Sequence, residues 1–264
     1  MSTKINWCDE VWNPITGCSF GCDYCYARKM SYRLAGRFGY PSHVPGQHPF
    51  DVTFHRDRLP IPFQWRKPRR IFVNSMGDLF DTAVPVEWLS EVMQIMDRAR
   101  IHTFMVLTKQ ASRMMEYLQD VKALGGGNPP SNIWWGVSVE DQATAEERIS
   151  MLLLTPAANR FVSCEPILGP VNLEKEIHFG DHRPPFSWID GLNWLIVGGE
   201  SGSKARPARP EWVRSLKDQA RRADVPFMLK SWGGNRPEFT VTDNMNGCRM
   251  PRTLDGNEYL EFPK

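Results

Sequence analysis

Three cysteines within eight residues, Cys18, Cys22 and Cys25, are the side chains of this sequence best suited to chemistry. Their spacing is C-x3-C-x2-C, and an aromatic residue, Tyr24, stands directly before the third thiol. Cysteine thiolates are the usual ligands of iron–sulfur clusters. Three thiolates on one tight loop can hold three corners of a cubane 4Fe–4S cluster and leave the fourth iron without a protein ligand. An open metal position of this kind is typical of catalytic rather than structural sites.

A structural zinc ion is the alternative use of the same loop. Structural zinc needs four protein ligands, usually two close pairs far apart in the sequence. The triplet lacks such a partner pair, because the other three cysteines are isolated: Cys8, Cys164 and Cys248. The fourth ligand would then come from one of three histidines: His43, His48 or His55. We expect the cluster and keep zinc as the alternative.

The composition and charge of the chain indicate its compartment but do not identify its binding partner. Its 264 residues carry 32 basic and 30 acidic side chains, so net charge argues neither for nor against nucleic acid. The sequence has no export signal and no apolar run long enough to span a bilayer, which predicts a protein of a reducing cytosol, without disulfides. The basic residues gather in short runs, which are either solvated loops or phosphate contacts: Arg66, Lys67, Arg69, Arg70, Lys204, Arg206 and Arg209.

The elements that must position these groups are apolar strands alternating with amphipathic helices. The strands are expected at 70–74, 103–107, 133–137, 160–164, 193–197 and 226–230, and the helices at 85–99, 111–118, 141–154 and 210–223. With one more strand between Asn6 and Cys18, this pattern predicts an α/β fold, a full or partial (β/α) barrel. We expect one domain over 1–264, with insertions at about 36–67 and 168–191 and an irregular tail from about 233.

Polar residues follow these strands at their carboxyl ends, where α/β barrels carry their chemistry. Glu140 could bind a ribose or serve the first turn of the next helix. Cys164 is either a buried small side chain or a hydrogen-atom donor to a product radical. Glu165 and Glu200 could bind a substrate amine, act as acid and base, or pair with arginines.

The cysteine loop resembles the signature of the radical S-adenosylmethionine (SAM) superfamily, which has three cysteines at this spacing and an aromatic before the third. The resemblance implies a 4Fe–4S cluster on Cys18, Cys22 and Cys25, whose free iron chelates SAM. It also implies reductive cleavage of SAM to methionine and a 5′-deoxyadenosyl radical, which takes a hydrogen atom from the substrate. A flavodoxin-like or ferredoxin-like protein would supply the electron, and Tyr24 would contact the adenine or pack within the loop.

The superfamily also has a polar, glycine-containing motif after its second strand, which holds the methionine end of SAM. Residues of this chain in that place are Asn74, Ser75, Gly77 and Asp78, without the two glycines and the glutamate of the common form. Lys109 and Ser138 look like positions of spore photoproduct lyase and its relatives, where a lysine and a serine contact SAM. Glu165-Pro166 is similar to that branch as well.

Nearly the whole chain is similar to a phage- and prophage-associated three-cysteine family. The segments that carry this likeness are 12–17, 107–109, 165–166 and 198–201. Some radical SAM proteins of phage genomes act on hypermodified thymine, so the substrate implied is a nucleobase, a nucleotide, DNA or RNA. Two other hypotheses stay open: a nucleic-acid- or partner-binding protein with structural zinc, and a radical SAM enzyme for a peptide or amino acid.

Overall fold

The computed structural model describes residues 5–126, 130–177, 186–202, 204–234 and 253–263. Two compact units divide the chain, one of residues 1–136 with 155–159 and the other of residues 137–154 with 160–264. The predicted single domain over 1–264 stays a prediction.

The first unit contains three parallel strands: β1 (Glu10–Trp12), β4 (Arg70–Val73) and β5 (Thr103–Thr108). They pair in the order in which they occur along the chain, β1 with β4 and β4 with β5. Helices α3 (Val86–Arg98) and α4 (Ala111–Val121) follow β4 and β5, and α4 ends in a π-helical turn, η2 (Lys122–Gly126). Leu89, Val92 and Met96 of α3 are fully buried, as the apolar spacing of that helix indicates. Strands β4 and β5 bury most of their side chains, which is why they read as continuous apolar runs.

The second unit repeats this arrangement with β7 (Asn159–Cys164), β10 (Trp194–Gly198) and β11 (Phe227–Ser231), which are also parallel. Helix α5 (Gln142–Leu154) precedes β7, and α6 (Pro210–Arg222) connects β10 to β11. The tail beyond the undescribed residues adds a short hairpin, β12 (Thr253–Leu254) and β13 (Asn257–Glu258), and then bonds to β11, where the Leu229 N–H donates to the Tyr259 carbonyl. Of the predicted irregular tail, these last residues are therefore ordered.

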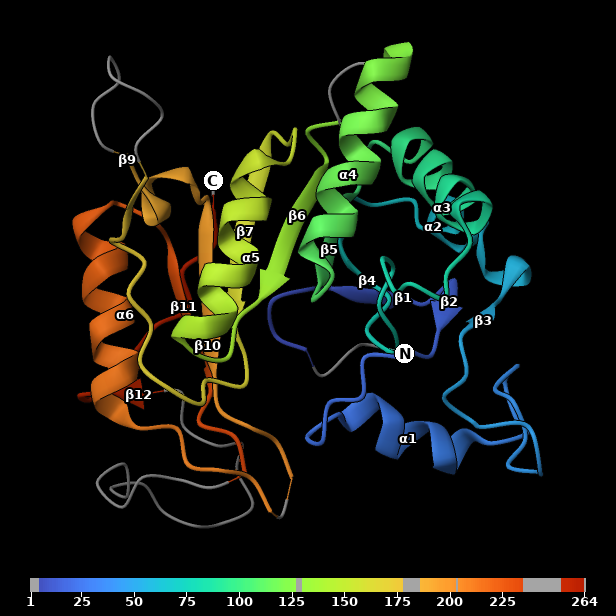
Figure 1. The fold of residues 1–264 in the computed structure, drawn as a ribbon, viewed down its shortest axis with the longest axis horizontal. Coiled ribbons are helices and arrows are strands. Elements are labelled where there is room, and N and C mark those ends of the chain that lie inside the picture. Colours follow the sequence, from blue (N-terminus) through green and yellow to red (C-terminus); the bar gives the residue numbers. More distant parts are fainter. Residues whose placement is uncertain (1–4, 127–129, 178–185, 203, 235–252, 264) are drawn as a thin grey trace. The chain divides into compact units, whose positions relative to one another are not determined.

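Strand β6 (Ile133–Ser138) runs from the first unit into the second, and the sheet order is β1-β4-β5-β6-β7-β10-β11. Figure 1 shows the strands and helices alternating along the chain. The predicted α/β fold with a parallel sheet is confirmed, including the extra strand before Cys18. Because β1 and β11 stand at the two ends of this order, the sheet has the order of a partial rather than a closed barrel.

Both predicted insertions contain secondary structure. The first carries β3 (Thr53–Phe54), η1 (Arg56–Arg58) and α2 (Ile61–Gln64), and β3 pairs with β2 (Ile15–Thr16) just before the cysteines. The second carries the hairpin β8 (Glu176–Ile177) and β9 (Phe186–Ser187) and the turn η3 (Trp188–Gly191). Helix α1 (Tyr26–Leu34), directly after the cysteine loop, was not foreseen from the sequence. In the described part of the chain, every helix is too short or too polar to cross a membrane.

Candidate active site

The cysteine loop begins at a glycine that two other segments enclose. The Gly17 N–H donates to the Met76 carbonyl at 2.9 Å, and Gly17 forms a parallel bridge with Gly77. Gly17 has a φ of +87°, and a Cβ there would stand 2.3 Å from the Asp51 carbonyl oxygen. Only glycine meets both conditions. The loop is therefore held between the end of β4 and the first insertion.

Two of the three thiols already accept backbone hydrogen bonds. The Phe20 N–H donates to Cys18 Sγ at 3.4 Å, and the Arg28 N–H donates to Cys25 Sγ at 3.3 Å, so Cys25 caps α1. All three thiols are free and partly exposed. Burial raises the pKa of the Cys18 thiol, and the nearby Asp78 and Asp81 carboxylates raise it further. Thiolates with amide donors suit a cluster, since N–H···S bonds and charge set cluster properties. Within the described residues, no three His, Cys, Asp or Glu side chains are grouped around a single metal position.

The end of β4 supplies polar groups beside this loop. Asn74 is buried, has a φ of +56° and accepts the Ile15 N–H through Oδ1 at 3.2 Å. Its Nδ2 has no hydrogen-bond partner among the described residues. The Ser75 hydroxyl donates to Asn13 Oδ1 at 3.1 Å, and the Tyr26 hydroxyl donates to the Ser75 carbonyl. The 74–77 turn is thus tied both to the Trp12-Asn-Pro segment and to α1.

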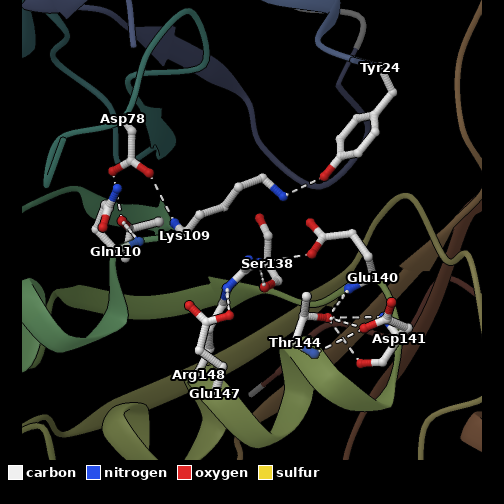
Figure 2. A network of polar contacts seen from close by, with 11 residues as sticks. Tyr24, Asp78, Lys109, Gln110, Ser138, Glu140, Asp141, Thr144, Glu147 and Arg148 are labelled. Carbon is white, nitrogen blue, oxygen red and sulfur yellow. Dashed lines mark hydrogen bonds and ion pairs between the residues drawn. The ribbon is translucent and has the colours of Figure 1, made fainter. Parts of the chain in front are cut away.

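Asp78 connects the ends of β4 and β5. Its carboxylate accepts the Thr108 hydroxyl at 2.7 Å, the Lys109 N–H at 2.9 Å and the Phe80 N–H at 2.9 Å. Burial raises the pKa of Asp78 even though these three donors favour the carboxylate. Because this buried carboxyl group accepts the Lys109 N–H, it fixes the backbone at Lys109. Figure 2 shows the Lys109 side chain extending to Tyr24, whose hydroxyl accepts from Nζ at 2.9 Å.

In the second unit, Glu140 forms a buried ion pair with Arg148 at 2.9 Å, and both side chains are less than a tenth exposed. Arg148 also donates to the Ser138 carbonyl at 2.8 Å (Figure 2). The first turn of α5 is capped separately, because Asp141 accepts the Thr144 N–H and Thr144 Oγ1 accepts the Glu140 and Asp141 N–H groups. Asp141 and Thr144 therefore supply the helix capping, which was one of the two roles expected for Glu140.

The ends of β7, β10 and β11 bring a second polar group together. Glu165 pairs with Lys230, and a Cβ on Gly198 would stand 3.3 Å from the Glu165 carboxyl carbon. Glu200 pairs with Arg206 at 2.6 Å, as the arginine-pairing alternative for this residue predicted. Cys164 is fully buried, and burial raises the pKa of its thiol to about 12.

The first unit therefore joins the three cysteines to Tyr24, the 74–78 turn and Lys109, and the second joins Glu165 to Lys230 and Ser138 to Arg148 and Glu140. Sequence reasoning missed five polar partners in these groups: Asn13, Tyr26, Asp81, Arg148 and Lys230. Asn13 and Lys230 had a usable signal, since each adjoins a segment already identified. The other three lie at positions that no local pattern distinguishes.

A family model described as "Protein of unknown function (DUF5131)" matches residues 2–263. The chain belongs to the DUF5131 family. No curated protein matches this DUF5131 chain.

Solved structures similar to this DUF5131 protein are forms of spore photoproduct lyase. A cysteine-to-serine mutant of that enzyme aligns with a TM-score of 0.48 and 12% identity, over 90% of this chain and 79% of that chain. A cysteine-to-alanine mutant with dinucleoside spore photoproduct gives 0.46 and 11% identity, over 84% and 75%. The enzyme complexed with the same ligand gives 0.45 and 12% identity, over 84% and 75%. At such identities, each residue's role has to be argued from this chain's own geometry.

Proposed function

We propose that this DUF5131 protein is a radical SAM enzyme. The observation that carries the proposal is the cysteine loop itself. Three free, partly exposed thiols lie on one loop that Gly17 anchors to the end of β4, and two of them accept backbone N–H groups. Cys18, Cys22 and Cys25 would bind a 4Fe–4S cluster, and the cluster with SAM would supply a hydrogen-abstracting radical.

The residues around the loop would bind and orient SAM. Lys109 carries a positive charge suited to a carboxylate, and Asp78 holds its backbone in place through the Lys109 N–H. Asn74, at the end of β4, offers a buried Nδ2 donor without a hydrogen-bond partner among the described residues. Ser75 and Gly77 shape the turn, and Tyr24 flanks Lys109. Glu140 and Ser138, ordered by Arg148, would contact the nucleoside part of SAM.

Cys164, Glu165 and Glu200 would act on the substrate. A thiol with a pKa of about 12 stays protonated at neutral pH, as a hydrogen-atom donor must. Donation would break the S–H bond homolytically and form a C–H bond in the product, leaving a thiyl radical. Glu165 with Lys230, and Glu200 with Arg206, are charge-balanced pairs that could exchange a proton with substrate or bind its charged groups.

A nucleobase within a nucleotide or nucleic acid is the substrate that we favour. Support comes from the exposed basic residues Arg66, Lys67 and Lys204, which form no ion pair with an acidic side chain in the described part of the chain. Arg69 and Arg70, by contrast, pair with Glu10 and Asp9. Polymeric substrate binding should weaken steeply with salt, because phosphate contacts release counterions. Competition between oligonucleotides and peptides, at low and high salt, separates this substrate from a peptide or amino acid.

The test of the radical chemistry is anaerobic reconstitution with iron and sulfide, reduction, and addition of SAM. We expect a cluster EPR signal that SAM perturbs, together with 5′-deoxyadenosine. Cys22→Ala should abolish both, whereas Cys8→Ala, a change at a buried cysteine outside the loop, should abolish neither. One tight zinc per chain, with no cluster and no SAM cleavage, would establish the structural-metal alternative instead.

A further inference from the structure

Asp81 is a fully buried carboxylate that holds the cysteine loop directly. Its Oδ2 accepts the Ser19 N–H at 2.7 Å, and its Oδ1 accepts the Ser19 hydroxyl at 2.9 Å. Oδ1 also accepts the Ala83 N–H at 2.9 Å, which closes the turn that contains Asp81. Both carboxylate oxygens are thus bonded to Ser19, the residue after Cys18.

The turn that carries Asp81 is itself fixed. Arg113 of α4 donates to the carbonyl oxygens of Phe80, Asp81 and Val84, the last at 2.5 Å. These bonds engage the backbone and leave the Asp81 carboxylate to Ser19 and Ala83. Since hydrogen bonds to charged groups are stronger than those between neutral groups, Asp81 is a strong constraint on a loop whose Ser19 and Phe20 are exposed.

We propose that Asp81 is the positioning residue of the cysteine loop and that its negative charge lowers the reduction potential of the cluster bound there. This inference rests on the proposed function. Reduction adds an electron to the cluster, and a fixed negative charge against a ligand disfavours the more negative state. Net charge and hydrogen bonding at the ligands are among the factors that set cluster potentials. In a buried position the charge is screened less than at the surface.

The first experiment uses the apo protein and needs no cluster. Hydrogen exchange of the 17–25 segment is compared between wild type, Asp81→Asn and Asp97→Asn, where Asp97 is an exposed aspartate paired with Arg100. We expect the Ser19 amide to exchange at least ten times faster in Asp81→Asn and unchanged in Asp97→Asn. Equal protection in all three proteins would overturn the positioning role.

The second experiment measures the midpoint potential of the reconstituted cluster by EPR-monitored titration. At a fixed applied potential, Asp81→Asn should raise the ratio of reduced to oxidised cluster at least tenfold. For a one-electron couple, a tenfold change in this ratio corresponds to a midpoint potential that is 59 mV higher. Asp97→Asn should leave it unchanged. An unchanged potential in Asp81→Asn would overturn the charge effect.

A second pair of variants guards against misfolding of Asp81→Asn. The Phe20 side chain is exposed, so Phe20→Asp and its neutral match Phe20→Asn should both fold. Phe20→Asp should move the potential in the negative direction relative to Phe20→Asn, and the absence of a difference would count against the proposal. If wild type binds no cluster, the proposed function fails and the charge effect with it, while hydrogen exchange still decides the positioning role.

Discussion

Lys109 donates a hydrogen bond from Nζ to the hydroxyl of Tyr24 at 2.9 Å, and the ammonium lies 5.3 Å from the centroid of the same ring. The contact joins the end of β5 to the cysteine loop, although the two residues are 85 positions apart in the sequence. Lys109 is also tied to the end of β4, because its N–H donates to Asp78. The lysine therefore stands where three chain segments meet.

We expect Lys109→Met to weaken SAM binding about tenfold or more, because a hydrogen bond from a charged donor is worth about 1.5–3 kcal/mol. Tyr24→Phe removes only a neutral hydroxyl and should weaken SAM binding less than Lys109→Met does. Lys29→Met, at an exposed position on α1, is the matched control and should bind as wild type. Anaerobic calorimetry with SAM measures all three. Wild-type affinity in Lys109→Met would remove Lys109 from the binding site.

Stability should fall below pH 6.5 because of His55. This buried imidazole bonds to the Thr16 hydroxyl at 2.8 Å, and burial, with the Arg58 charge, lowers its pKa from 6.5 to about 4. Above pH 6.5 the ring is neutral in both the folded and the unfolded state. Below it the unfolded chain takes up the proton first, so the free energy of unfolding drops by at most about 1.4 kcal/mol per pH unit, until the folded pKa is reached.

Denaturant unfolding of wild type and His55→Gln, at pH 7.5 and at pH 5, measures this effect. The variant should lose less stability than wild type on acidification, although it starts from a lower value. Comparing the two proteins removes the contributions of other groups, including Asp78, whose raised pKa acts in the opposite direction. Parallel losses in both proteins would contradict the prediction.

Cys164 should resist alkylation in the folded protein. Its side chain is fully buried and its pKa is raised to about 12, so almost no thiolate is present at pH 8. Cys22 and Cys25 are partly exposed and should react first in the apo protein. Mass spectrometry after timed iodoacetamide treatment identifies the modified positions. Cys164 should react only when denaturant is added, and early modification there would show that the site opens in solution.

Breaking the Glu140–Arg148 pair should destabilise the protein strongly. Glu140→Ala leaves a buried guanidinium without its carboxylate, which typically costs about 3–5 kcal/mol. The control lies on α5, the helix that carries Arg148: Glu146 pairs with Lys175 at the surface, and Glu146→Ala should cause no measurable loss. Denaturant midpoints compare the two variants. A double variant, Glu140→Leu with Arg148→Met, should regain much of the loss, because a matched apolar pair requires no charge burial.

The sequence by itself determined the elements. Apolar runs such as 70–73 and 103–108 are buried on both faces, and the spacing of Leu89, Val92 and Met96 marks a helix, so strand and helix could be assigned from local pattern alone. Val86, three positions before Leu89, is exposed because it occupies the first helical position after Pro85. The cysteine spacing likewise identified the loop that would bind a cluster.

Only the tertiary structure decided which polar groups meet. The sequence placed Asp78 directly after a strand, but it did not show that the Asp78 carboxylate bonds to Thr108 and Lys109, some 30 residues further along. Asp81 reaches Ser19 across 62 positions, and Lys230 reaches Glu165 across 65. Such contacts leave no periodic trace in the sequence, because hydrogen bonds and ion pairs depend on distances of a few ångströms that exist only once the strands have been brought side by side.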